Sequence, residues 1–66
     1  MTVDEIKIQV KIIGEVAGDA EVAHAYEDQL HQTVLRNIAE GMCEDPTGCA
    51  AAALLTNEFD FPRWCA

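Results

Sequence analysis

The sequence predicts a small α+β domain of order β-α-α, with all 66 residues in a single domain. Three observations lead to this prediction. Side chains alternate between apolar and polar near the N-terminus, a long central stretch carries helical spacing of apolar residues without a proline, and a run of alanines and leucines follows it. Because one strand cannot satisfy its own backbone hydrogen bonds, we expect the sheet to be completed across a homodimer, with the two helices packed as a hairpin on one face.

The N-terminal strand is predicted over about residues 3–13. Alternation with a period of two and a high content of β-branched residues are typical of a half-buried strand. The side chains expected on the buried, dimer-forming face are Ile6, Ile8, Val10 and Ile12. The polar side chains on the opposite face are Lys7, Gln9 and Lys11. A short strand near residues 59–61 is an alternative pairing partner within one chain.

Two helices are predicted after this strand. The first covers about residues 19–40, because Asp19 is placed to cap its start and Gly41 to end it. Its apolar side chains recur every four residues, at Val22, Tyr26, Leu30, Val34 and Ile38. The second helix covers about residues 46–58, and residues 59–66 follow as an aromatic tail.

Charge is the strongest indication of function. The formal net charge is −8, and between Glu15 and Asp60 ten acidic residues accompany the single cation Arg36. Such a surface repels nucleic-acid phosphates and attracts basic protein surfaces. We therefore expect a partner protein with a basic surface, and nucleic-acid binding is disfavoured.

The sequence indicates a cytoplasmic protein that does not enter a membrane. No apolar run reaches the roughly 18 residues that a membrane span requires. The first five residues are acidic on balance, whereas a secretory signal begins with positive charge.

The cysteines also favour a reducing compartment, because their number is odd: Cys43, Cys49 and Cys65. Five residues separate Cys43 from Cys49. That spacing is compatible with a small disulfide loop and with a pair of thiolate metal ligands, and the sequence leaves both open. Packing in the loop and core is the role we expect.

Catalysis and cofactor binding find little support. The chain has no serine and no glycine-rich phosphate loop, and it offers little volume for a substrate pocket. His24, Asp28 and His31 lie on one side of the predicted long helix and form a possible metal stripe. Helical zinc sites normally add a further ligand from elsewhere, so we expect a solvated acidic face and no metal or other cofactor.

The function predicted from these observations is that of a small acidic, non-enzymatic binding module, an inhibitor or regulator that occupies a basic surface of a larger protein. In size and acidity the chain resembles many phage-encoded proteins that block host or defence factors. The residues expected to bind the partner are Glu21, Glu27, Asp28, Phe61 and Trp64.

Two other functions remain open. The order strand-helix-helix resembles the ribbon-helix-helix repressors, in which two chains pair their strands and read the major groove. That resemblance implies a DNA-binding dimer whose reading residues are Lys7, Gln9 and Lys11. The second alternative is a small structural or assembly subunit, which predicts higher-order association.

Overall fold

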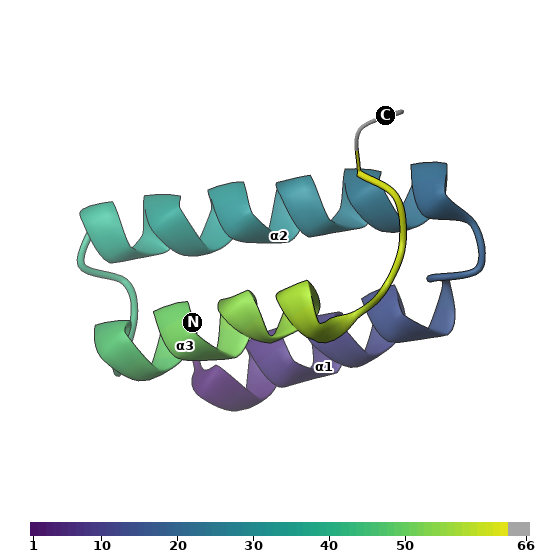
Figure 1. Cartoon of the computed structure of the whole chain (residues 1–66). Coiled ribbons are helices and arrows are strands. Elements are labelled where there is room, and N and C mark those ends of the chain that lie inside the picture. Colours follow the sequence, from purple (N-terminus) through teal and green to yellow (C-terminus); the bar gives the residue numbers. More distant parts are fainter. Residues whose placement is uncertain (64–66) are drawn as a thin grey trace.

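The computed structural model describes residues 1–63, which form a bundle of three helices (Figure 1). The helices are α1 (Val3–Glu15), α2 (Ala20–Ala39) and α3 (Pro46–Leu54), and α3 continues into the short 3₁₀ helix η1 (Leu55–Glu58). Helix α2 sets the length of the molecule, while α1 and α3 lie along it and against each other. The C-terminal segment then crosses back towards α2.

The predicted α+β class is wrong. Residues 1–63 are 73% helical and contain no β-strand. The segment predicted as a strand is α1, and four apolar residues at helical spacing face the rest of the bundle: Val3, Ile6, Val10 and Ile13. Ile8, which the strand prediction placed beside Ile6, is 59% exposed. Because a helix satisfies its backbone hydrogen bonds internally, the reason for expecting a strand-paired homodimer disappears.

A capping box fixes the start of α1. The Thr2 hydroxyl accepts a hydrogen bond from the Glu5 amide at 3.2 Å, and the Glu5 carboxylate accepts one from the Thr2 amide at 2.8 Å. The hydrogen bonds from the Thr2 backbone and side chain lower the pKa of Glu5. The motif specifies a helix locally, ahead of any tertiary contact.

Replacing Thr2 with alanine is expected to lower the free energy of unfolding by about 1 kcal/mol, because the Glu5 amide loses its acceptor. Urea denaturation followed by circular dichroism measures the change. Thr47, an exposed threonine in the first turn of α3, provides a matched control, and Thr47→Ala is expected to leave stability nearly unchanged. Equal losses in the two variants would contradict a specific capping role for Thr2.

The other helix starts use single side-chain caps. Asp19 accepts from the Val22 amide at 3.3 Å at the start of α2, and Asp45 accepts from the Gly48 amide at 3.1 Å at the start of α3. After α2 the chain turns at Gly41, whose φ of 71° is a conformation that glycine adopts without strain.

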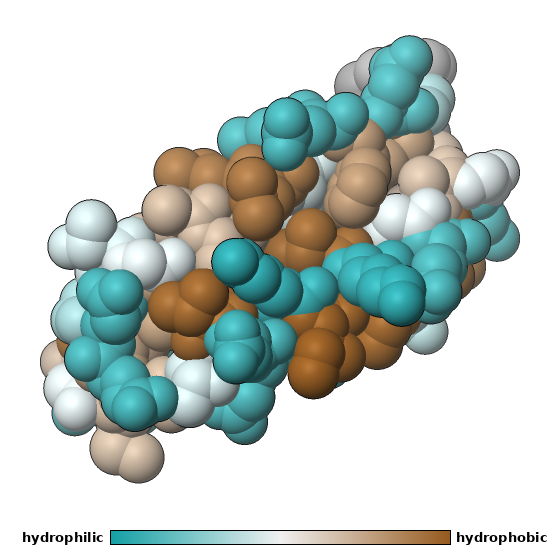
Figure 2. Space-filling model, turned by 90° about the horizontal axis from the view of Figure 1, so that it is seen from below, coloured by the Kyte–Doolittle hydropathy of each residue, from teal (hydrophilic) through white to brown (hydrophobic). Residues whose placement is uncertain are grey.

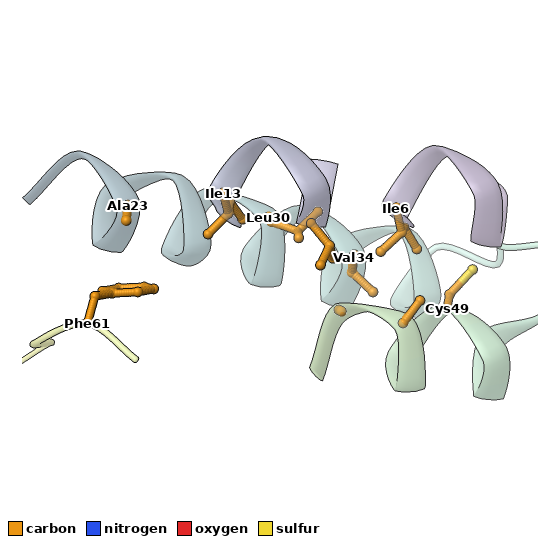
Figure 3. Close-up of a cluster of buried hydrophobic side chains, with 10 residues drawn as sticks. Ile6, Ile13, Ala23, Leu30, Val34, Cys49 and Phe61 are labelled. Carbon is orange, nitrogen blue, oxygen red and sulfur yellow. The ribbon is translucent and has the colours of Figure 1, made fainter. Parts of the chain in front are cut away.

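The core runs along the line where the three helices meet (Figure 3). Its buried apolar residues are Ile6, Val10, Ile13, Ala23, Leu30, Val34, Cys49, Ala52, Ala53 and Phe61. The contribution of α3 consists of small side chains, which allow its axis to approach α1 and α2 closely. Among residues 1–63 no helix combines the length and the apolar character required to cross a membrane.

The C-terminal aromatic side chains complete this core. Phe61 is 5% exposed and lies near Ala23 of α2 (Figure 3). The Phe59 ring packs over Gly14 in the last turn of α1, where an added Cβ would come within 2.8 Å of the ring. A side chain at position 14 would therefore displace Phe59.

Candidate protein-binding surface

Acidic side chains dominate the surface of the described residues. Eleven of the twelve acidic residues are exposed: Asp4, Glu5, Glu15, Asp19, Glu21, Asp28, Glu40, Glu44, Asp45, Glu58 and Asp60. The exposed Lys and Arg side chains among residues 1–63 are Lys7, Lys11 and Arg36. The excess of negative charge therefore lies on the exposed surface, where it can act on a partner.

Glu27 is the exception among the acids, because it is buried and does not lie on the surface where the partner-binding prediction would place it. It is 4% exposed, and its two carboxylate oxygens accept hydrogen bonds from Nε and Nη2 of Arg63 at 2.7 and 3.0 Å. Burial alone raises the pKa of Glu27, but the hydrogen bonds from Arg63 and Thr56 outweigh it, so the net pKa is lowered. The carboxylate stays ionised inside the fold.

Arg63 also ties the C-terminal segment together. Its guanidinium donates to the backbone carbonyl oxygens of Thr56, Phe59 and Phe61 at 2.9, 3.2 and 3.3 Å. It also lies 4.0 Å from the centroid of the Phe61 ring. We call this arrangement, together with Glu27, the Glu27–Arg63 clamp, and it holds residues 59–63 against α2.

The predicted aromatic anchors are not exposed where the structure describes them. Phe61 is buried in the core beside the clamp, so its side chain is not on the surface where the predicted partner contact would place it. Trp64 lies outside the described residues. Of the five residues predicted to bind a partner, Glu21 and Asp28 are exposed, and both lie on α2.

The possible metal stripe separates into two unrelated sets of contacts. Nε2 of His24 lies 3.4 Å from a carboxylate oxygen of Asp28. Nε2 of His31 instead lies 3.1 Å from both the Ala53 carbonyl oxygen and the Thr56 hydroxyl, and so connects α2 to α3 and η1. No cluster of three or more His, Cys, Asp or Glu side chains that could hold a metal ion occurs in residues 1–63.

The two cysteines in the described part of the chain are free thiols. Cys49 is buried in the core and Cys43 is half-buried. Burial, together with the hydrogen bond and charge of the neighbouring Cys49, raises the pKa of Cys43, which favours the protonated thiol over a thiolate ligand. Cys65 lies outside the described residues.

An apolar groove runs between α2 and α3. It encloses about 260 Å³, and its lining residues are His31, Val34, Leu35, Ile38, Ala50, Ala53 and Leu54. Leu35 and Leu54, on the two opposite walls, are 66% and 58% exposed. We call this feature the α2–α3 groove. Sequence reasoning missed this groove, because both leucines belong to helices whose core-facing residues are elsewhere.

A second, more polar groove of about 530 Å³ lies between α1 and α2. Its walls include Gln9, Tyr26 and Gln29 above the apolar Ile6 and Leu30. Lys7 and Lys11 are exposed on α1. These side chains project from a helix, so the two-stranded ribbon required by the ribbon-helix-helix comparison is absent from residues 1–63.

The underside of the molecule, formed where α1 and α3 lie below α2, has no continuous apolar face. Figure 2 shows hydrophilic side chains running between the apolar groups on this side. Exposed apolar side chains that are separated in this way are ordinary on protein surfaces. The α2–α3 groove differs because two exposed leucines border one apolar depression.

Comparisons of the chain with protein-family models, with curated proteins and with solved structures found no match.

Proposed function

We propose that this protein is a non-enzymatic binding module that presents an acidic helical surface to a basic surface of a larger protein and acts on that protein as an inhibitor or regulator. The observation that carries the proposal is the distribution of charge. Among residues 1–63, eleven carboxylate side chains are exposed against three exposed Lys and Arg side chains, while the one buried carboxylate is neutralised within the fold by Arg63. Charge that is fixed on packed helices steers a partner of opposite sign and favours one orientation of it.

Part of the acidic surface has structural roles, which narrows the region left for binding. Glu5, Asp19 and Asp45 cap helices. Glu21 and Asp28 are exposed along α2, and neither caps a helix start. The two residues are seven positions apart, which is about two helical turns, so they lie on the same face of α2. The outer face of α2 is therefore the part of the surface that we expect a basic partner to contact.

Neutralising this face is expected to weaken partner capture. In affinity capture from a native lysate followed by mass spectrometry, Glu21→Gln/Asp28→Asn is expected to retain at least about tenfold less of the basic partner than the unmodified protein does. The matched control is Glu15→Gln/Glu40→Gln, which removes the same charge from exposed positions outside this face. The captured amount is also expected to fall as salt is raised.

Equal capture by the two double variants and the unmodified protein would contradict a role for the acidic face of α2. Failure to capture any stoichiometric basic partner at low salt would contradict the proposed function as a whole. Circular dichroism spectra of all three proteins establish that the fold is unchanged.

A further inference from the structure

We infer that the α2–α3 groove is the docking site for a cationic amphipathic helix of the partner protein. The inference rests on the proposed function and adds to it the surface that is used and the kind of segment that binds there. It follows from the apolar lining of the groove, from its size and from the acidic residues at its ends.

The groove has the form that accepts apolar side chains from a helix. Leu35 on α2 and Leu54 on α3 rise on either side, and the alanines on the α3 wall leave space between them. A volume of about 260 Å³ is below the usual range for pockets that enclose a small molecule. An amphipathic helix instead inserts apolar side chains spaced by three or four residues into such a groove and leaves the rest of its surface outside.

Acidic residues lie at both ends of this groove. The contact of His31 with Thr56 aligns the two walls, and Asp28 precedes His31 by three residues while Glu58 follows Thr56 by two. Asp28 and Glu58 therefore lie near the same end. At the opposite end, Glu44 lies directly before Asp45, the cap of α3.

Asp28, Glu44 and Glu58 are exposed and cap no helix, so they are accessible to a partner. Arg36, the cation of α2, is exposed but does not line the groove. Basic side chains flanking the apolar stripe of a bound helix would therefore meet negative charge at each end of the groove.

A second copy of the chain is a poor occupant by the same reasoning. Each copy carries a formal net charge of −8, so bringing two grooves together opposes like charges. A cationic amphipathic helix can pack apolar side chains against the lining of the groove and place basic side chains beside its acidic ends. The charge complementarity therefore favours a heterologous basic helix over self-association.

The test uses a synthetic leucine–lysine amphipathic peptide of about 18 residues, long enough to hold a helix on binding, titrated into isotopically labelled protein. Amide chemical shifts are expected to change mainly in residues 31–38 and 50–54. Leu35→Gln/Leu54→Gln is expected to raise the dissociation constant at least about tenfold, because it removes both apolar walls. Ile8→Gln is the matched control, since Ile8 is 59% exposed on α1 and lines neither groove, and it is expected to leave the dissociation constant within about twofold.

Three results would overturn the inference. The first is a set of shift changes centred on another surface. The second is an equal loss of peptide affinity in Ile8→Gln and in the leucine double variant. The third is dimerisation: sedimentation shows that the free protein is a dimer and that the Leu35→Gln/Leu54→Gln variant is a monomer. A second copy of the chain would then occupy the groove.

The experiment separates failure of the groove from failure of the proposed function. If Glu21→Gln/Asp28→Asn weakens peptide binding and the leucine double variant does not, the groove is not the docking site. The acidic binding surface of the proposed function would still stand. Absence of peptide binding together with absence of a captured basic partner would refute both.

Discussion

Replacing Glu27 with glutamine is expected to lower the free energy of unfolding by about 2 to 3 kcal/mol, because Arg63 then loses its charged partner. The Glu27 side chain is 5% exposed, so water does not replace the lost interaction at that end. The Arg63 side chain is 34% exposed, which keeps the loss at the lower end of the range for broken buried ion pairs. Urea denaturation at pH 7 measures it.

A double-mutant cycle with Arg63→Gln isolates the interaction itself. The two single variants are expected to lose similar amounts, and the double variant clearly less than their sum. Glu40→Gln is the control for loss of one acidic charge from α2, since Glu40 is exposed at the end of that helix, and it is expected to change stability little. Additive losses would show that Glu27 and Arg63 stabilise the fold independently.

The contribution of the clamp is also expected to depend on pH. The pKa of Glu27 is lowered in the folded state, so the folded protein holds the carboxylate ionised more strongly than the unfolded chain does. That stabilisation is fully present above the ordinary carboxyl pKa, near 4.5, and is lost as the pH falls through the lower folded value. The stability difference between the unmodified protein and Glu27→Gln is therefore expected to be constant near neutral pH and to shrink in acid. A difference that grows in acid would contradict an ionised Glu27.

The helical part of the fold could be predicted from the sequence because its signals are local. Asp19 and Asp45 are strong caps, and Gly41 permits the turn after α2. The sequence predicts a strand where α1 lies, because the isoleucines and valines of this segment fit the periodicity of a strand and that of a helix. Alternate residues from Ile6 to Ile12 are apolar, but Ile6, Val10 and Ile13 also follow helical spacing.

The capping box was the signal that could have decided between the two. Thr2 followed three residues later by Glu5 specifies a helix start, and a strand makes no use of it. β-branched residues favour strands only weakly when tertiary packing supports a helix. In α1 the N-terminal cap and the buried apolar face therefore outweigh the β propensity of the isoleucines and valines.

The negative surface could be predicted from composition, whereas the partners of individual acids could not. Glu27 and Asp28 are adjacent in sequence and equally acidic, yet one is buried and the other exposed. The difference comes from Arg63, which is 36 residues away along the chain. The burial of Phe61 has the same origin, because its place depends on where the segment after η1 crosses α2.

Alanine at Ile6 is expected to produce the largest loss of stability in the chain, about 3 kcal/mol, whereas alanine at Ile8 is expected to have almost no effect. Ile6 is 0% exposed at the meeting point of the three helices, so truncation leaves a cavity in the core. Ile8 is 59% exposed, and alanine is a better helix former than isoleucine at such a position. A domain of this length has only about 3 to 10 kcal/mol of total stability, so Ile6→Ala is expected to unfold at a markedly lower urea concentration.

This pair of variants also tests the secondary structure of the N-terminal segment. A strand would place both isoleucines on one buried face, and the two substitutions would then destabilise the protein by similar amounts. The helix separates them by two residues, or about 200° around its axis, so their effects diverge. If Ile6→Ala and Ile8→Ala lower the denaturation midpoint by similar amounts, the N-terminal segment is not the helix α1. The burial pattern on which the core and the α2–α3 groove depend would then also be wrong.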